Sequence, residues 1–245
     1  MTGSVLKIKK QSVFIGILVG MCIIVGFSWG GYSKQPSILF QKKVVVLGDS
    51  ITEQNIWQPL IESELGGSWV NCGVGSTPLG GENHTNAFWR EGRLEDVKSN
   101  NPDILIIFGG ANDLTLNPEI GTSTNLEDKN TSTFIGAYSY IIDNLLTWKP
   151  NLQIIIVSTT WAHNDGRDYS TTVTYGDYAK ACELVSQYYH LPYVDLYNES
   201  GFNQYTVGDP PNNIYSEDHI HPNAAGAKVI ASMISAKLIE INRMQ

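Results

Sequence analysis

The sequence is poor in cysteine, with three among 245 residues, and these three form no recognisable pattern. Cys22 lies in an apolar stretch, and Cys72 and Cys182 stand far apart in the rest of the chain. No C-x-x-C pair and no metal-ligand spacing is present, which argues against a structural zinc site, a redox motif or a disulfide framework. We expect Cys72 and Cys182 to be unpaired small apolar side chains, and we expect no metal site.

Basic residues are also scarce, with 16 Lys and Arg against 24 Asp and Glu. Residues 1–35 contain four lysines and no acidic residue, which leaves 12 basic and 24 acidic residues in the remainder and a formal net charge of −12 there. A surface this acidic repels phosphate groups, so we expect neither nucleic acid nor an anionic membrane surface as a partner of residues 36–245.

Only one long uncharged, mostly apolar run is present, over residues 12–29, and three lysines lie just before it, at positions 7–10. As a helix the run would be roughly 27 Å long, close to the thickness of a bilayer core. A buried core helix is the alternative, but the basic flank is typical of a signal peptide or signal-anchor. No clear A-x-A site follows, so we favour a retained anchor over cleavage. We predict an N-terminal export segment and linker at 1–35, an extracytoplasmic domain at 36–245, and membrane contact through the N-terminal segment alone.

In the domain, apolar runs alternate with amphipathic stretches. The predicted strands are Lys43–Leu47, Trp69–Val74, Asp103–Phe108, Gln153–Ser158 and Leu191–Asp195. The predicted helices are Ile56–Leu65, Asn86–Lys98, Thr133–Trp148, Tyr175–His190 and Asn223–Asn242. Continuous β-branched runs indicate strands buried on both faces of a parallel sheet. The pattern predicts an α/β fold, a three-layer α/β/α sandwich around a mostly parallel five-stranded sheet.

Polar and glycine-rich segments follow the first three predicted strands, and another lies near the C-terminus. These segments are Gly48–Thr52, Gly73–Thr77, Gly109–Asp113 and Asp218–Asn223. Ligands of such folds bind beyond the carboxyl ends of the strands, so these segments are expected to meet at one edge. The two longest irregular segments, Leu114–Ser132 and Asn198–Glu217, are candidates for loops that face a substrate.

The segments at this edge contain the groups that nucleophilic catalysis needs. The hydroxyl of Ser50 is a weak nucleophile unless a base takes its proton, and a histidine oriented by a carboxylate can serve as that base. Asp218 and His221 are three residues apart, so in a helical turn their side chains can touch. His219 is adjacent to Asp218 and is expected to point elsewhere, which favours His221 as the base.

An acyl-transfer site also needs donors for the oxyanion of the tetrahedral intermediate. Asn112 offers a side-chain amide, and Ser50 and Gly75 offer backbone N–H groups. Gly73 or Ser76 could take the place of Gly75, because a donor from the backbone does not depend on the side chain.

Three further residues lie at the same edge. Asp49 and Asp113 are expected to hold their loops through hydrogen bonds to the backbone. Trp161 follows the fourth strand and is a candidate substrate-binding residue, although ordinary packing explains a tryptophan there equally well.

The four segments together resemble the ordered blocks of the SGNH (GDSL-like) hydrolases. G-D-S, a glycine loop, G-x-N-D and D-x-x-H-P occur in that order between about Lys43 and Asn242. The resemblance implies a flavodoxin-like fold, a serine esterase without metal or organic cofactor, Ser50, Asp218 and His221 as catalytic residues, and Ser50, Gly75 and Asn112 around the oxyanion. The second block departs from the family pattern, since it often has two glycines before Ser or Thr where this chain has Val74-Gly75-Ser76-Thr77.

The expected reaction is hydrolysis of a carboxylic ester through an acyl-enzyme on Ser50. Small-molecule esters and O-acetyl groups on glycans both suit the motifs. A membrane-anchored O-acyltransferase would use the same residues, and a non-catalytic binding scaffold is a third alternative. The sequence does not indicate an oligomeric state.

Overall fold

The computed structural model describes residues 37–116, 118–162 and 173–243. The five strands of the sheet are β1 (Lys43–Gly48), β2 (Ser68–Gly73), β3 (Ile104–Phe108), β4 (Gln153–Val157) and β5 (Tyr193–Val194). All neighbouring strands pair in parallel, in the order β2-β1-β3-β4-β5. This is the order of the flavodoxin-like doubly wound sheet, and the predicted α/β/α sandwich is confirmed.

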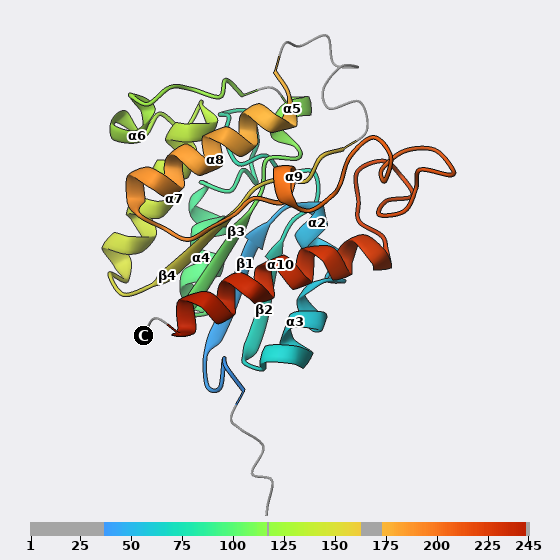
Figure 1. Cartoon of the computed structure of the whole chain (residues 1–245). Helices are drawn as coiled ribbons and strands as arrows, with labels where there is room; N and C mark the ends of the chain where they lie inside the picture. Colours follow the sequence, from blue (N-terminus) through green and yellow to red (C-terminus); the bar gives the residue numbers. More distant parts are fainter. Residues whose placement is uncertain (1–36, 117, 163–172, 244–245) are drawn as a thin grey trace, which may run out of the picture. The chain divides into compact units, whose positions relative to one another are not determined.

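Helices cover both faces of this sheet (Figure 1). The longer ones are α3 (Gln58–Leu65), α4 (Glu91–Ser99), α7 (Phe134–Trp148), α8 (Tyr175–Tyr189) and α10 (Ala224–Arg243). One-turn helices lie in the connections, namely α2 (Ser50–Glu53), α5 (Asp113–Leu116), α6 (Asn125–Asp128) and α9 (Leu196–Glu199). Thr133 and Thr174 begin α7 and α8, because each side-chain oxygen accepts the third N–H of its helix.

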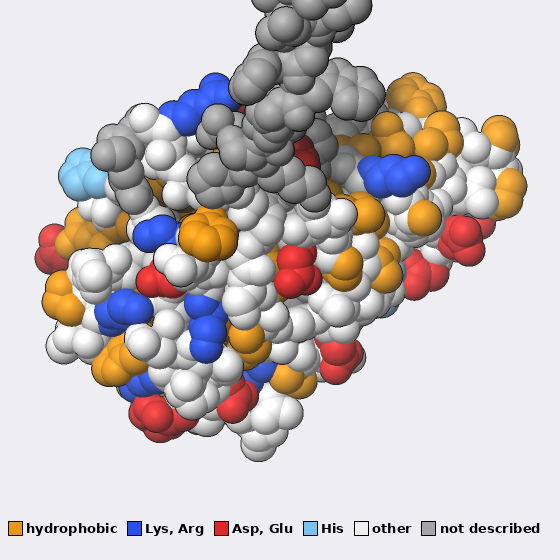
Figure 2. Space-filling view, turned by 90° about the horizontal axis from the view of Figure 1, so that it is seen from below, with side chains coloured by type: hydrophobic (Ala, Val, Ile, Leu, Met, Phe, Trp, Pro, Cys, Tyr) orange, Lys and Arg blue, Asp and Glu red, His pale blue; other side chains and the backbone are white. Residues whose placement is uncertain are grey.

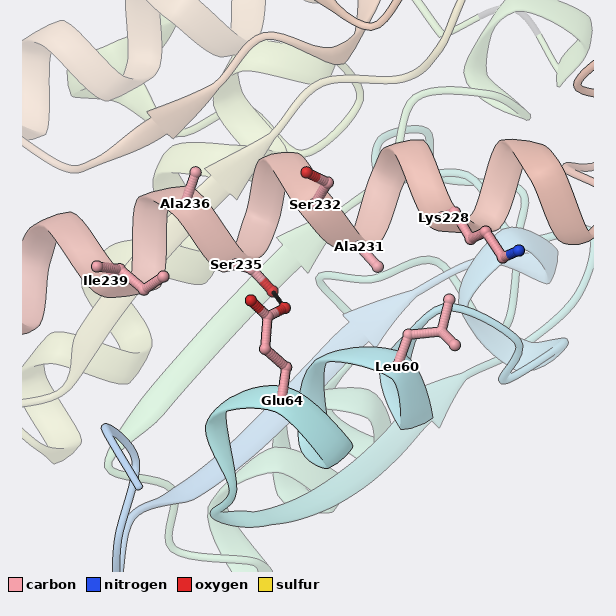
Figure 3. A pocket seen from close by; sticks show the side chains of 8 residues that line it. All are labelled: Leu60, Glu64, Lys228, Ala231, Ser232, Ser235, Ala236 and Ile239. Atoms are coloured by element: carbon pink, nitrogen blue, oxygen red, sulfur yellow. Dashed lines mark hydrogen bonds between the residues drawn. The ribbon is translucent and has the colours of Figure 1, made fainter. Parts of the chain in front are cut away.

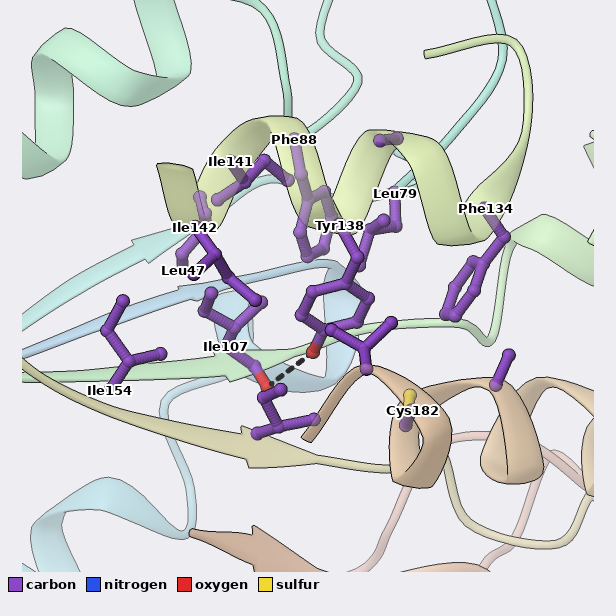
Figure 4. Packing of buried hydrophobic residues seen from close by; sticks show 14 of the residues in the cluster. Leu47, Leu79, Phe88, Ile107, Phe134, Tyr138, Ile141, Ile142, Ile154 and Cys182 are labelled. Carbon is purple, nitrogen blue, oxygen red and sulfur yellow. Dashed lines mark hydrogen bonds between the residues drawn. The ribbon is translucent and has the colours of Figure 1, made fainter. Parts of the chain in front are cut away.

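Alternate residues of the central strands point into two separate cores. Val45, Leu105 and Ile154 pack with α4, α7 and α8, and Val44, Ile104 and Ile155 pack with α3 and α10. Figure 4 shows the first core, in which the hydroxyl of Tyr138 donates to the carbonyl of Ile107 at 3.3 Å. The central strands β1, β3 and β4 are therefore buried on both faces, as their continuous apolar runs predict. The edge strand β2, which was also predicted to be buried, is only partly so.

Helix α4 begins later than predicted. The sequence pattern places its start at Asn86, whereas α4 begins at Glu91. Ala87 and Phe88 are fully buried but lie outside any helix, and the backbone of Arg90 is extended. The apolar residues before Glu91 thus fill the core without belonging to the helix, which periodicity alone does not reveal.

Cys72 and Cys182 are unpaired thiols, as expected. The predicted export segment at 1–35 lies outside the described residues. Within residues 37–116, 118–162 and 173–243, no helix has the length and apolar character needed to cross a membrane.

Candidate active site

Ser50 lies where β1 ends and α2 begins. Asp49, one residue earlier, is the N-cap of α2, and its buried carboxylate accepts the N–H of Ile51 at 3.0 Å. Gly48 leaves no room for a side chain, because an added Cβ would lie 2.0 Å from Oγ1 of Thr52. The chain therefore turns tightly from strand into helix and presents Ser50 at the carboxyl edge of the sheet (Figure 1).

The structure brings Ser50, His221 and Asp218 into one chain of contacts. Nε2 of His221 lies 2.8 Å from Oγ of Ser50, and Nδ1 of His221 lies 2.7 Å from Oδ2 of Asp218. Ser50 and His221 are 171 residues apart, so the fold creates this contact. The order of the three groups, hydroxyl, imidazole and carboxylate, is that of a nucleophile, its general base and the carboxylate that orients the base.

The contact between Asp218 and His221 arises differently from the prediction. The prediction placed both in a helical turn, but residues 218–221 form bends, with His219 in the left-handed region at φ 75°. Oδ1 of Asp218 accepts the N–H groups of Ile220 at 3.1 Å and His221 at 2.7 Å. His219 points away, as expected, with its Nε2 3.3 Å from Oδ1 of Asp209.

The same hydrogen bonds set the charge of Asp218. Partial burial disfavours its ionised form, but donors from the ring and backbone of His221 and from Ile220 outweigh burial. The pKa of Asp218 is therefore lowered from its ordinary value. An ionised Asp218 can hold a proton on Nδ1 of His221, which leaves Nε2 as the acceptor facing Ser50.

The loop after β2 lies next to Ser50, and the amide of Asn112 bonds to this loop. Nδ2 of Asn112 donates one hydrogen to the carbonyl of Thr77 at 3.2 Å, and a side-chain amide has a second one to donate. Gly75 is next to the serine, since a Cβ built on it would lie 3.8 Å from Cβ of Ser50. The N–H of Gly73 donates to Oδ1 of Asn71 at 2.8 Å, which disfavours Gly73 as the backbone donor.

Asp113, the residue after Asn112, anchors the loop that follows β2. It is fully buried, and its carboxylate accepts the N–H groups of Leu79 and Gly80 at 2.9 Å each, in agreement with its expected role. Burial raises the pKa of Asp113 to about 7 despite these donors, with the charge of Asp49 adding to the effect. The carboxylate thus joins the Asn112 loop to the loop after β2.

Arg93, which no sequence motif pointed to, lies beneath the strand-to-helix turn at Ser50. Its side chain is 4% exposed, and Nη2 donates to the carbonyl of Gly48 at 2.8 Å. Burial lowers the pKa of Arg93 from its ordinary value, and the charges around it, Asp49 among them, act in the opposite direction. The signal was a basic residue on the inward face of α4, next to Leu94 and one turn before Val97.

Trp161 is partly buried and packs against the core between the sheet and α10. Its role in substrate binding stays a prediction. Among the described residues, no three His, Cys, Asp or Glu side chains gather as they would around a metal ion. That the reaction needs no cofactor stays a prediction.

One groove on the surface lies apart from these residues. A groove of about 400 Å³ runs between α3 and α10, where Oγ of Ser235 donates to Oε2 of Glu64 at 3.0 Å (Figure 3). None of the residues predicted for the site lines it.

On the face seen from below, Lys and Arg side chains are interspersed with Asp and Glu (Figure 2). The predicted absence of a nucleic-acid partner stays a prediction.

Residues 46–229 match the model of the GDSL-like Lipase/Acylhydrolase family, and this range contains Ser50, Asn112, Asp218 and His221. No curated protein matches the chain.

Several solved structures have the same fold. A protein from Lactobacillus plantarum is 25% identical, with a TM-score of 0.69 over 81% of this chain and 97% of that one. The lipase/acylhydrolase from Enterococcus faecalis is 21% identical, with a TM-score of 0.60 over 83% of this chain and 96% of that one. A GDSL-like lipase from Bacteroides thetaiotaomicron is 18% identical, with a TM-score of 0.56 over 82% and 89% of the two chains.

Proposed function

Because the chain belongs to the GDSL-like lipase/acylhydrolase family, we propose that it hydrolyses carboxylic esters through an acyl-enzyme on Ser50. The observation that carries the proposal is the contact of Ser50 Oγ with His221 Nε2 at 2.8 Å, continued to Asp218 at 2.7 Å. At these distances the imidazole can accept the hydroxyl proton directly, which is the geometry that general-base catalysis requires.

The reaction has two halves. In the first, Oγ of Ser50 attacks the carbonyl carbon while its proton passes to Nε2 of His221. The tetrahedral intermediate then expels the alcohol, which takes that proton. In the second half, His221 removes a proton from water, the hydroxide attacks the acyl carbon, and the carboxylic acid leaves as Ser50 recovers its proton.

The negative oxygen of both intermediates needs hydrogen-bond donors. We assign the second amide hydrogen of Asn112, the N–H of Gly75 and the N–H of Ser50 to it. Ser50 is the first residue of α2, and the first N–H groups of a helix have no partner within the helix. The closeness of Gly75 to Ser50, and the hydrogen bond that occupies the N–H of Gly73, support this choice.

The test is turnover of p-nitrophenyl acetate by the purified protein. Ser50→Ala should abolish turnover and labelling by a fluorophosphonate, whereas Ser99→Ala, which changes an exposed serine at the end of α4, should affect neither. Wild-type protein that is folded but gives no turnover and no label would overturn the proposal and favour the binding-scaffold alternative.

We infer that the acyl group is short and the alcohol is a glycan hydroxyl or a small molecule. The net negative charge of the domain and the predicted export support a neutral substrate outside the cytoplasm. The same acyl-enzyme could pass its acyl group to a sugar hydroxyl. With an acetyl donor and a glycan acceptor, excess free acetate would support hydrolysis, and excess acetylated glycan would favour transfer.

We propose that residues 1–35 direct the domain across a membrane and remain as its anchor. The three lysines followed by the apolar run at 12–29 support export, and the lack of a clear cleavage site supports retention. Mass spectrometry of the N-terminus from the producing cell tests this: an intact segment in the membrane fraction is expected. A mature protein that begins after the apolar run would overturn the anchor.

A further inference from the structure

A polar cavity of about 350 Å³ is lined by residues that follow the proposed donors Gly75 and Asn112 along the chain. Three segments form it: the loop after β2, the end of α5 together with Pro118 and Glu119, and the residue before the N-cap of α7. The lining residues that matter here are Glu82, Asn83, His84, Leu116, Glu119 and Ser132. Its volume is at the lower end of the range of small-molecule sites.

Two walls of this cavity are continuations of two segments that meet at Asn112: its own segment, and the loop after β2 to which it bonds. Asn112 bonds Thr77, and the carboxylate of Asp113 accepts the N–H groups of Leu79 and Gly80, so the two segments run side by side. From that junction one segment leads directly into Gly81, and the other leads through the single turn of α5 to Leu116. Since α5 rises by roughly 6 Å, the cavity begins about one helical turn from the proposed oxyanion donor.

The walls are held in place by hydrogen bonds to their backbone. Gly81 donates its N–H to the carbonyl of Thr131 at 2.9 Å, and its own carbonyl accepts Nε1 of Trp89 at 3.1 Å. The guanidinium of Arg90 donates to the carbonyls of Glu82 and His84. These bonds fix the shape of the loop before any ligand arrives, which reduces the entropy cost of binding.

The opposite wall is fixed in the same way. The carbonyl of Glu119 accepts the N–H of Phe134 at 2.8 Å, and the carbonyl of Pro118 accepts the buried hydroxyl of Tyr178 at 3.2 Å. The bonds on both walls go to backbone atoms, so the side chains of Glu82 and Glu119 do not carry the shape of the cavity.

The chemistry of the lining selects a class of ligand. Two carboxylates, an amide, an imidazole and a hydroxyl offer many acceptors and several donors, and no Lys or Arg side chain lines the cavity. The two carboxylates therefore disfavour anionic groups such as phosphate, and the nearby guanidinium of Arg90 is already bonded to backbone carbonyls. Leu116 and Pro118 add an apolar patch, against which the C–H face of a sugar ring can pack.

We propose that this cavity binds the alcohol part of the ester, and that this alcohol is an uncharged sugar. The inference rests on the proposed function, because the sugar is bound here so that its acyl group reaches Ser50. The carboxylates of Glu82 and Glu119 accept hydrogen bonds from the sugar hydroxyls. They determine which alcohol is accepted and take no part in bond breaking.

The experiment compares an acetylated neutral oligosaccharide with p-nitrophenyl acetate, which has no sugar. The double variant Glu82→Gln/Glu119→Gln keeps the side-chain size and removes both charges. Hydrogen bonds to charged groups are the stronger kind, so we expect the KM for the oligosaccharide to rise on the order of tenfold. kcat/KM for p-nitrophenyl acetate should stay within about twofold. Glu127→Gln, an exposed residue of α6 outside the cavity, should change neither.

The possible results separate this inference from the proposed function. Wild-type protein that fails to hydrolyse p-nitrophenyl acetate would contradict the proposed function. Turnover of p-nitrophenyl acetate together with an unchanged KM of the double variant for the oligosaccharide would overturn the sugar site. An equal loss on both substrates would also overturn it, because the carboxylates would then support the triad and not the alcohol. The melting temperature of each variant confirms that it is folded.

Discussion

Asp218 holds His221 twice, with one carboxylate oxygen on each of two donors. Oδ1 accepts the backbone N–H of His221 at 2.7 Å, and Oδ2 lies 2.7 Å from Nδ1 of its ring. Both contacts lie within four consecutive residues, so the bend at 218–221 holds the carboxylate against the imidazole that it orients. The partner that the ring must reach, Ser50, comes from the other end of the chain, and the fold has to deliver only that one contact.

Asp218→Asn tests the importance of this double contact. The amide replaces one acceptor oxygen by an NH₂ group, so either the ring or the backbone of His221 then faces a donor. We expect kcat for p-nitrophenyl acetate to fall by on the order of 10²–10⁴, because the imidazole loses its correct tautomer or orientation. The side chain of Asp218 is 58% exposed, so the melting temperature should change little.

Glu217→Gln is the matched control, since it removes an exposed carboxylate one residue away. It should leave kcat unchanged. A decrease of less than tenfold for Asp218→Asn would show that the bend alone orients His221.

Asn112→Ala should reduce kcat by on the order of 10²–10³ if the amide is a main oxyanion donor. KM should change less, because the charge it stabilises exists only in the transition state. Steady-state kinetics on p-nitrophenyl acetate measures both values. A loss below about tenfold would mean that the hydrogen bond to Thr77, which positions the loop, is the main role of Asn112.

The two glycines after β2 should respond differently to alanine. A Cβ on Gly73 would lie 2.3 Å from the backbone nitrogen of Glu53, so α2 would have to move. We expect Gly73→Ala to lower the free energy of unfolding by on the order of 1–3 kcal/mol and to reduce kcat. At Gly75 the close atom is Oε2 of Glu53, at 2.6 Å, the end of a flexible side chain.

Gly75→Ala should therefore keep most of its stability, since Glu53 can rotate away. Urea denaturation of both variants is the measurement. Equal losses of stability would contradict the idea that backbone contact with α2 is what requires a glycine at position 73.

The sheet could be predicted from sequence because its strands are continuous apolar runs. Val44–Leu47 and Ile104–Phe108 are buried on both faces, and a parallel sheet between two layers of helices buries its strands in that way. The start of α4 could not be predicted, because Phe88 is apolar and precedes the helix while its burial comes from distant residues. The periodicity of apolar residues predicts which side chains are buried, but it does not predict whether a buried residue such as Phe88 belongs to a helix or to a loop.

The candidate site divides in the same way. Ser50, Asn112, Asp218 and His221 were predicted because their motifs follow one another at the ends of the right elements. Arg93 was missed, because its function depends on the carbonyl of Gly48, 45 residues away. The choice among backbone donors likewise needed a three-dimensional contact, the hydrogen bond from Gly73 to Asn71.

Asp49 should make stability depend on pH in a definite direction. Its carboxyl is buried behind Ser50, and burial raises its pKa from 3.8 to about 6. The folded protein therefore holds a proton on Asp49 between about pH 4 and 6 that the unfolded chain has released. The stabilisation from this group is complete below pH 3.8 and is lost as the pH rises through 6.

Asp49→Asn removes the titration and keeps a carbonyl oxygen that can accept the N–H of Ile51. The free energy of unfolding of the variant minus that of the wild type should rise by up to about 1.4 kcal/mol per pH unit between pH 4 and 6. Above the pKa of Asp49 the difference should level off. Urea denaturation at several pH values measures it, and Asp96→Asn, an exposed residue of α4, serves as the control. Parallel stability curves for Asp49→Asn and wild type would mean that Arg93 and the helix N-terminus offset the cost of burying this carboxylate.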